Sequence, residues 1–468
     1  MTQQGVRWTT DQVLALAPDA ASRKAGSKLG AAGPWSETGS SDEGAVWGLC
    51  KGSGSKPYQT IVDTGGGPAG TGTAYKCTCP SRKFPCKHAL GLLLLWASGA
   101  TQVPTAQAPD WTEQWLENRK NRAAQKRTEA TAPDSAGGPA DPEAARRRAE
   151  RRAQRVTAGV TELEQRLTDL LRGGLAQAEQ AGYGLWEETA ARMVDAQAPG
   201  LAARVRELGA IPASGPGWPM RLLEECALIH LLNKGWQHQS ALPEPLATTV
   251  RSRIGLPATP PTQPPLRDSW LILSQYDRTD GHLTTRRIWL HGTESDRTAL
   301  LLSFGAAGRA PSLALPPGLT IDAELKTHPG ATHRADLTTH HGTPPQPPSP
   351  LGTHSPTGVD VHTALTAYGQ ALTADPWLDS WPVTLAEVIP TRTPDGTGWQ
   401  LADAAGKYAL PLTPRAPTPT PTPLPPNLWR LIALSGGAPV TVFGECGHAG
   451  FHPLSTWTQK NPEIIPLT

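Results

Sequence analysis

The sequence predicts an α+β multidomain protein with a small ββα module, a helical middle domain and a β-rich C-terminal domain. Three observations support this prediction. Strand-forming segments lead into a short apolar run near the N-terminus, apolar residues recur at steps of three and four in the middle of the chain, and short alternating segments between turn residues fill the remainder. The 468 residues include 47 Gly and 48 Pro, which indicates extended connections between compact parts.

The first domain comprises residues 1–108, and its core is expected at residues 45–97. Two short helices open this domain. Ala45–Cys50 and Tyr58–Asp63 are rich in strand-forming residues and flank a turn of Gly, Ser and Pro, which is typical of a β-hairpin. The apolar run at 89–96 has the length and character of a buried helix.

A metal-binding motif lies between the hairpin and this helix, in the segment Cys77-Thr-Cys-Pro-Ser-Arg-Lys-Phe-Pro-Cys-Lys-His88. Cysteines at positions i and i+2 of a strand point to the same face, so Cys77 and Cys79 can hold one ion. Pro85 is expected to hold Cys86 in the turn and to leave His88 in the first turn of the helix. A structural zinc ion takes four such ligands in a tetrahedron, so we predict a closed, non-catalytic Zn²⁺ site that makes this a ββα zinc module. The alternative is four unrelated buried residues, which the two tight pairs and the positive surroundings disfavour.

The pattern Cys-x-Cys-(x6)-Cys-x-His resembles the SWIM-type zinc finger, and the flanking segments 47–58 and 79–95 resemble the bacterial SWIM zinc finger family in particular. Segments 186–199 and 374–382 extend the resemblance beyond the finger. The resemblance implies a DNA-binding or protein-interaction module, often considered beside AAA-type ATPases and von Willebrand A-domain proteins. It implies no established reaction.

Positive charge is concentrated beside the metal motif. Residues 1–155 hold 21 Lys and Arg against 14 Asp and Glu, whereas the rest of the chain holds 22 against 27. Such a basic region can bind phosphates without regard to base sequence and in a salt-sensitive way. A solvated helix and a flexible linker are the alternative, and the sequence leaves both open. The candidate contacts are Lys76, Arg82, Lys83 and Lys87 beside the motif, and Arg146, Arg147 and Arg151 further on.

The remaining divisions follow from composition and periodicity. Ala and Arg dominate a basic linker that can be partly helical, leucines at helical spacing mark the middle domain, and a proline-rich spacer closes it. Alternating apolar segments with Asp-Gly and Ala-Gly turns then indicate strands. The expected parts are a linker at 109–155, a helical domain at 156–254, and a β-rich domain at 266–468 with Pro-rich inserts at 342–356 and 414–426.

Two other groups of possible ligands attract attention. Cys446, His448 and His452 lie close together but have no adjacent fourth ligand, so we expect loop residues rather than a second metal site. Several histidines lie in polar, Pro-rich segments and are expected to be exposed. They are His333, His340, His341 and His354.

Composition also limits the class of protein. Six cysteines in a chain of this length are not a secreted disulfide framework, and neither a signal peptide nor an apolar run of about 18 residues is present, so we expect a cytoplasmic protein with no membrane partner. No phosphate-binding Gly-x-x-x-x-Gly-Lys-Ser/Thr and no Gly-x-Ser-x-Gly elbow occurs, so we expect no enzyme. The expected function is zinc-supported nucleic-acid (DNA) binding, with a protein-interaction adaptor as the alternative.

Overall fold

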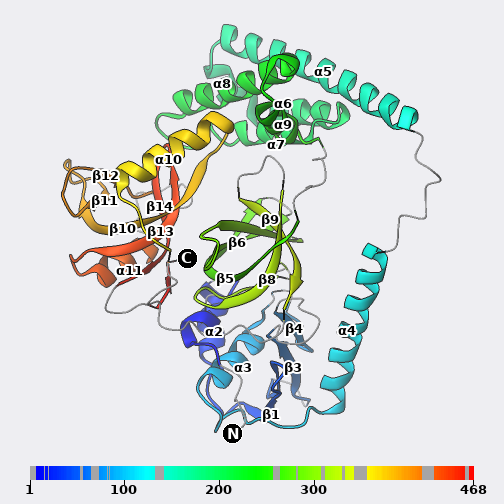
Figure 1. Ribbon diagram of the computed structural model, residues 1–468, viewed down its shortest axis with the longest axis vertical. Coiled ribbons are helices and arrows are strands. Elements are labelled where there is room, and N and C mark those ends of the chain that lie inside the picture. Colours follow the sequence, from blue (N-terminus) through cyan, green and yellow to red (C-terminus); the bar gives the residue numbers. More distant parts are fainter. Residues whose placement is uncertain are drawn as a thin grey trace.

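A computed structural model shows how these segments are arranged (Figure 1). Arg82, His354 and most of both Pro-rich inserts lie outside the residues that it describes. The structure describes residues 7–467 except for 15, 19, 53–55, 65–72, 82, 84, 132–141, 257–263, 281–282, 307–310, 312, 329–332, 342–355, 414–425 and 459–462. Within these residues, no helix combines the length and the apolar character needed to cross a membrane.

The N-terminal module is a four-stranded antiparallel sheet, in the order β1-β2-β3-β4, with helices packed against it. The expected hairpin is its centre, formed by β2 and β3. The sequence analysis missed β1 because Trp-Ser-Glu-Thr-Gly-Ser shows no apolar alternation. The elements are α1 (Thr10–Leu14), α2 (Ala20–Ser27), β1 (Trp35–Ser40), β2 (Ala45–Cys50), β3 (Tyr58–Asp63), β4 (Ala74–Cys77) and α3 (Lys87–Ala97).

Helix α3 is buried from His88 to Trp96 because apolar residues surround its whole circumference. The sheet covers one side, and α1 and α2 pack against another. Gly91 permits this close packing, since a Cβ atom there would lie within about 3 Å of Leu29. The helix therefore forms the core of the module and has no free apolar face.

The segment expected as a partly helical linker forms two helices in its described residues. Helix α4 (Asp110–Thr131) is held on the zinc module by an ion pair of 3.0 Å between Arg119 and Asp63. Helix α5 (Pro142–Gly173) begins before the domain boundary that we expected at residue 156. Ala, Arg, Gln and Glu are strong helix formers, so this segment forms helices although it offers little apolar surface for a core.

The middle domain is a helical bundle, as predicted, and α5 is its longest helix. The expected apolar residues Val156, Val160, Leu163 and Leu167 of α5 are buried in its core. The other helices are α6 (Ala176–Asp195), α7 (Pro199–Leu208), α8 (Trp218–Gln237) and α9 (Glu244–Ile254), with a short 3₁₀ turn η1 (Gln239–Ala241).

The described residues of the β-rich part form two separate sheets, and the first is a closed five-stranded barrel. Its strands follow the order β5-β6-β7-β9-β8, in which β7 and β9 pair in parallel and all other pairs are antiparallel. A closed barrel with the strand order 1-2-3-5-4 has the topology of the OB-fold. The strands are β5 (Leu266–Asp280), β6 (Leu283–Gly292), β7 (Thr298–Ala306), β8 (Thr320–Thr327) and β9 (Arg334–His340).

The barrel and the zinc module share one hydrophobic core, although the bundle separates them in the sequence. Leu92 and Leu93 of α3 belong to the same buried cluster as Trp270 and Ile288 of the barrel. Thr73 adds a direct tie, because its hydroxyl donates a hydrogen bond of 3.1 Å to the carbonyl oxygen of Ala314. The bundle is thus an insertion between two halves of one structural unit (Figure 1).

The second sheet is antiparallel, with six strands in the order β12-β11-β10-β13-β14-β15. Phe443, Leu454 and Trp457 pack it against the outside of the barrel, where they meet Leu271 and Trp289. Its elements are α10 (Val361–Ala374), β10 (Ser380–Arg392), β11 (Trp399–Asp403), β12 (Ala409–Pro411), α11 (Pro426–Ser435), β13 (Val440–Gly447), β14 (Gly450–Trp457) and β15 (Ile465–Pro466).

Two expectations about exposed or loop residues were wrong. Cys446 and His452 are strand residues of the β13–β14 hairpin, and only His448 lies in its turn. His333 is held between Trp289 and Trp381, with ring centroids 5.9 and 4.5 Å away, and burial lowers its pKa. Burial also lowers the pKa of His340. The sequence suggested exposure because the neighbouring residues are polar, but the partners of His333 come from other elements.

Candidate metal centre

The metal ligands come from the end of one strand, the following turn and the start of one helix. Cys77 is the last residue of β4, and Cys86 is the N-cap of α3 with extended backbone angles (φ −75°, ψ 168°). The amide of Leu90 donates to the carbonyl of Cys86 at 3.0 Å, so the first helical turn forms directly behind that cysteine. This confirms the prediction that Cys86 lies in the turn and His88 in the first helical turn.

The four ligand residues converge on one point. The sulfur atoms of Cys77, Cys79 and Cys86 and a ring nitrogen of His88 all lie within 4.8 Å of one another. The Cys77 Sγ to His88 Nδ1 distance is 3.7 Å. A tetrahedral zinc ion with bonds of about 2.3 Å to sulfur and 2.0–2.1 Å to nitrogen separates such a pair by roughly 3.6 Å. The cluster therefore fits zinc.

Two residues of β3 support the ligands from behind. The hydroxyl of Thr60 lies 3.3 Å from Cys77 Sγ, directly across the β3–β4 pairing. The ring of Tyr58 packs on His88 with centroids 4.9 Å apart. Such outer contacts orient the metal ligands. The sequence analysis missed both residues, but their i and i+2 spacing on a predicted strand was a usable signal, since it places them on one face.

The thiols differ in acidity. Hydrogen bonding from Cys86, and more weakly from His88 and Thr60, lowers the pKa of Cys77 to about 4, against the opposing effect of burial. The neighbouring Cys77 and burial raise the pKa of Cys86. A cation is needed to hold three thiolates together in this site.

Cys50 is not a fifth ligand. It is a fully buried residue of β2, and burial raises its pKa to about 11, so it stays a neutral thiol. Four protein ligands complete a tetrahedron and leave no open position for a substrate or a reactive water. The arrangement is that of a structural zinc site, which joins the end of β4 to the start of α3.

The basic residues proposed for nucleic-acid contact fall into two separate groups. Lys76 on β4 is half-buried, and Lys83 and Lys87 are exposed near the metal ligands. The arginines of α5 lie at the opposite end of the view in Figure 1. The structure therefore does not bring the two groups together into one surface.

A buried helix fixed to a sheet by a closed Cys3His site defines the class of this protein: a zinc-finger protein whose metal is structural. The family model described as the SWIM zinc finger matches residues 72–97, and the model of the SWIM-associated four-helix bundle domain matches residues 151–254. The chain therefore contains a SWIM zinc finger and a SWIM-associated four-helix bundle domain, and the Cys77, Cys79, Cys86 and His88 cluster of the finger fits zinc as its cofactor. No curated protein and no solved structure matches the chain.

Proposed function

We propose that this protein is a non-enzymatic nucleic-acid-binding protein whose zinc is structural and whose main phosphate contacts lie at the free end of α5. The single observation that carries the proposal is a row of arginines. Arg148, Arg151 and Arg155 are exposed, and their spacing of three and four residues places them on one side of the helix. None of them forms an ion pair with a carboxylate among the described residues.

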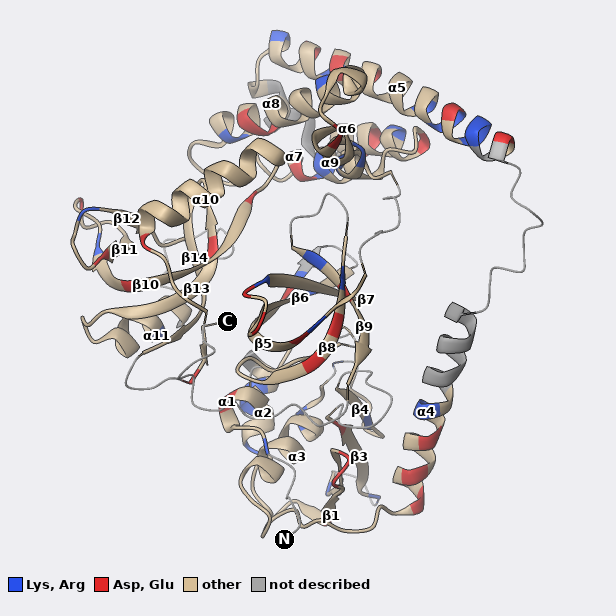
Figure 2. Ribbon diagram, in the orientation of Figure 1, with Lys and Arg blue, Asp and Glu red and all other residues tan. Residues whose placement is uncertain are grey.

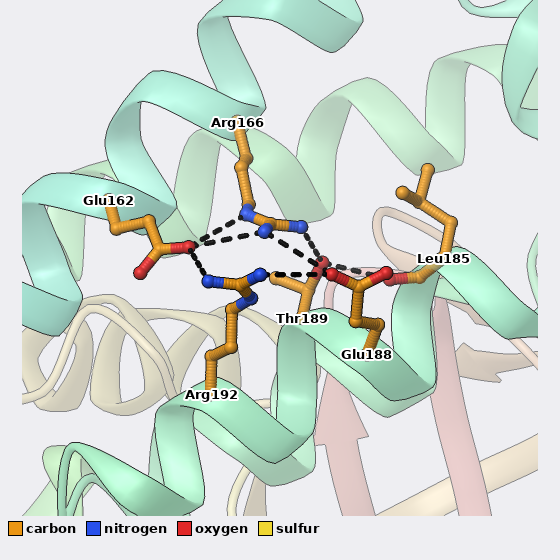
Figure 3. Close-up of polar contacts among 6 residues, drawn as sticks. All are labelled: Glu162, Arg166, Leu185, Glu188, Thr189 and Arg192. Carbon is orange, nitrogen blue, oxygen red and sulfur yellow. Dashed lines mark hydrogen bonds and ion pairs between the residues drawn. The ribbon is translucent and has the colours of Figure 1, made fainter.

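Several other arginines of the bundle are paired with acidic neighbours. Figure 3 shows Arg166 and Arg192 facing Glu162 and Glu188, with Nη–Oε distances between 3.0 and 3.6 Å. Arg146 and Arg147 are also paired, with Glu150 and Glu143. In Figure 2 the Lys and Arg segments near the start of α5 extend beyond the other helices of the bundle. The unpaired row is therefore the best placed to attract phosphates.

The finger itself is a weaker candidate. A helix that reads bases must enter a groove, and α3 is buried on all sides. Lys76, Lys83 and Lys87 can add phosphate contacts at the surface, where a thiolate-rich zinc site carries net negative charge. Any contact from either basic group would be to the sugar-phosphate backbone and would not depend on base sequence.

Fluorescence anisotropy with labelled duplex and single-stranded DNA over a series of salt concentrations tests this proposal. Each phosphate contact contributes about 0.9 to the slope of log affinity against log salt for a duplex. Removing Arg148, Arg151 and Arg155 together should reduce that slope by roughly 2 to 3. A wild-type chain that binds neither form at low salt, with zinc confirmed, refutes the proposal.

A matched control is available on the same helix. Arg151→Ala and Arg146→Ala remove the same charge, but Arg146 already pairs with Glu150 at 2.9 Å. We expect Arg151→Ala to weaken binding clearly more than Arg146→Ala. Equal effects would mean that only net charge matters and that the row has no special role.

A second candidate function is that of a protein-interaction adaptor. The bundle exposes large apolar side chains on α6 and α8, including Val194, Met220, Leu223 and Leu231. Leu163, Leu167, Leu170 and Trp186 line a groove of about 270 Å³ between α5 and α6. Apolar patches of this kind suit a protein partner, and an AAA-type ATPase or a von Willebrand A-domain protein is the partner we propose.

The adaptor function can be tested in the native cell. Crosslinking the wild-type chain and a Met220→Asp, Leu223→Asp variant, followed by mass spectrometry, should show one stoichiometric partner that the variant loses. Recovery of nucleic acid alone, with no protein that distinguishes the two chains, would count against the adaptor.

A further inference from the structure

The OB-type topology of the barrel directs attention to one of its faces. In OB-folds, oligonucleotides and oligosaccharides bind the outer face of the second and third strands and the loops beside it. Here these strands are β6 and β7. A shared fold does not by itself imply a shared ligand, so binding here depends on the side chains of this face.

Side chains along β7 alternate between the interior of the barrel and its outer face. Leu301 belongs to the interior core, whereas Leu300 and Leu302 face outward and pack with the C-terminal sheet. The next outward residue, Phe304, lies beyond the sheet and is 51 % exposed. The sheet thus covers one end of the outer face and leaves the other end free.

The free end holds a row of three side chains across three strands. Register places Arg278 opposite Thr285 and Thr285 opposite Phe304, so all three point to the same side. Arg278 is exposed, and Leu283, the first residue of β6, exposes 45 % of its surface nearby. A half-exposed aromatic ring on the same face as an exposed arginine is a stacking platform for a base.

The same face carries further positively charged side chains. Arg334 begins β9 and pairs in register with Leu300, so it lies on the outer face as well. Leu300 and Phe304 are four residue steps apart along β7, which is roughly 13 Å. Neither Arg278 nor Arg334 forms an ion pair with a described carboxylate. Arg287 lies between them and is fixed by Tyr276, whose hydroxyl accepts a hydrogen bond of 2.9 Å from its Nε.

A cleft of about 480 Å³ at the junction of barrel, bundle and sheet has Arg334 in its lining, but it suits a polyanion poorly. Its lining carries four arginines and four carboxylates, so it adds no net attraction for phosphate. The arginines are Arg204, Arg253, Arg287 and Arg334, and the carboxylates are Glu207, Glu225, Asp375 and Asp379. A nucleic acid would therefore follow the open row rather than enter the cleft.

We propose that the outer face of β5, β6 and β7 binds single-stranded nucleic acid, with Phe304 stacking on a base and Arg278 contacting a phosphate. This inference rests on the proposed nucleic-acid function and assigns it a second, structurally distinct surface. A single strand is required because bases within a duplex present no free face to a flat aromatic ring.

The experiment measures binding of a labelled oligothymidylate and of a duplex of equal length to the full zinc-loaded chain. Phe304→Ala should weaken single-strand binding roughly 5- to 150-fold, the range expected for loss of one stacked base. Phe304→Tyr should restore it, and duplex binding should change little. Trp429→Ala is the matched control, because Trp429 is an aromatic residue of similar exposure, 49 %, on α11.

The outcomes separate the two proposals. Unchanged single-strand binding by Phe304→Ala, together with weaker binding by Arg151→Ala, overturns the barrel inference and leaves the α5 proposal standing. A wild-type chain that binds the duplex but not the single strand also overturns the barrel inference and leaves the α5 proposal standing. Absence of binding to either nucleic acid overturns both. Thermal melts of each variant, followed by circular dichroism, test whether the protein stays folded when Phe304, a half-exposed residue, is replaced.

Discussion

The indole nitrogen of Trp377 donates a hydrogen bond of 2.8 Å to the backbone carbonyl of Leu228, a residue 149 positions earlier in the chain. Trp377 precedes the C-terminal sheet, yet it is buried in the core of the helical bundle. Beside it, Asp375 accepts a hydrogen bond of 3.1 Å from Nε of Arg253 on α9. This short segment anchors the bundle to the rest of the molecule.

Removing the indole should therefore weaken both the bundle and its attachment. We expect Trp377→Ala to cost about 3–5 kcal/mol of unfolding free energy, the usual effect of deleting a buried Trp, measured by urea unfolding. Trp377→Phe keeps most of the packing and should cost less. Limited proteolysis should release the bundle from the Ala variant earlier than from the wild type. An unchanged digestion pattern would show that other contacts hold the bundle in place.

Loss of zinc should affect more than the finger. Because α3 and the barrel share one core, His88→Ala or prolonged chelation should increase hydrogen exchange in β6 and β7 as well as in α3. The bundle has its own core and should keep its protection. Hydrogen-exchange mass spectrometry measures all three regions at once, and a barrel that stays fully protected after metal loss would contradict this expectation.

Two glycines in helices should respond in opposite ways to substitution by alanine. A Cβ atom on Gly200 would overlap the backbone oxygen of Arg253 where α7 meets α9, so Gly200→Ala should destabilise the protein by about 1–3 kcal/mol. Gly184 lies in α6 with no described atom within 4 Å of such a Cβ. Gly184→Ala should stabilise the protein by about 0.5–1 kcal/mol. Thermal unfolding measures both variants, and each serves as the control for the other because both make the same Gly→Ala change within a helix.

Glu225 should make stability depend on pH in an unusual direction. Burial raises the pKa of this carboxyl above its ordinary value of 4.5, against the opposing effect of Arg204 at 3.9 Å. The folded state therefore favours the protonated form, and stability from this group is full below pH 4.5 and is lost as pH rises through the raised pKa.

Replacing Glu225 by Gln removes this dependence. The melting temperature of Glu225→Gln should exceed that of the wild type at neutral pH, and the difference should vanish at pH values below the ordinary carboxyl range. Calorimetry across acid and neutral pH measures it. A variant that is less stable at neutral pH would mean that the ion pair with Arg204 outweighs burial.

The zinc site was predictable because its four ligands lie close together in the sequence. Cys77 through His88 form a local motif, so spacing alone identified the ligands and the start of α3. The leucine periodicity of the bundle is local in the same sense. Local patterns thus gave the correct class of fold and the correct cofactor.

The relationships that escaped prediction are those between distant segments. Closure of the barrel depends on pairing Leu266 with Leu325 and Leu300 with Arg334, which no local pattern encodes. The shared core of α3 and Trp270 has the same character. The extent of α4 and of the start of α5 also escaped prediction, because Ala, Arg and Glu favour a helix but show no apolar periodicity that would mark where it begins and ends.

The insertion of the bundle also has a consequence for how the chain is made. On the ribosome, the apolar helix that ends at Ala97 emerges 169 residues before Leu266, the first residue of the barrel that completes its core. At a translation rate of about 5–20 residues per second, this delay is roughly 8–34 s. During that interval α3 has its own sheet, α1, α2 and the zinc site to hold it but not the barrel, so metal supply and chaperone protection during synthesis should influence how much of the nascent protein matures.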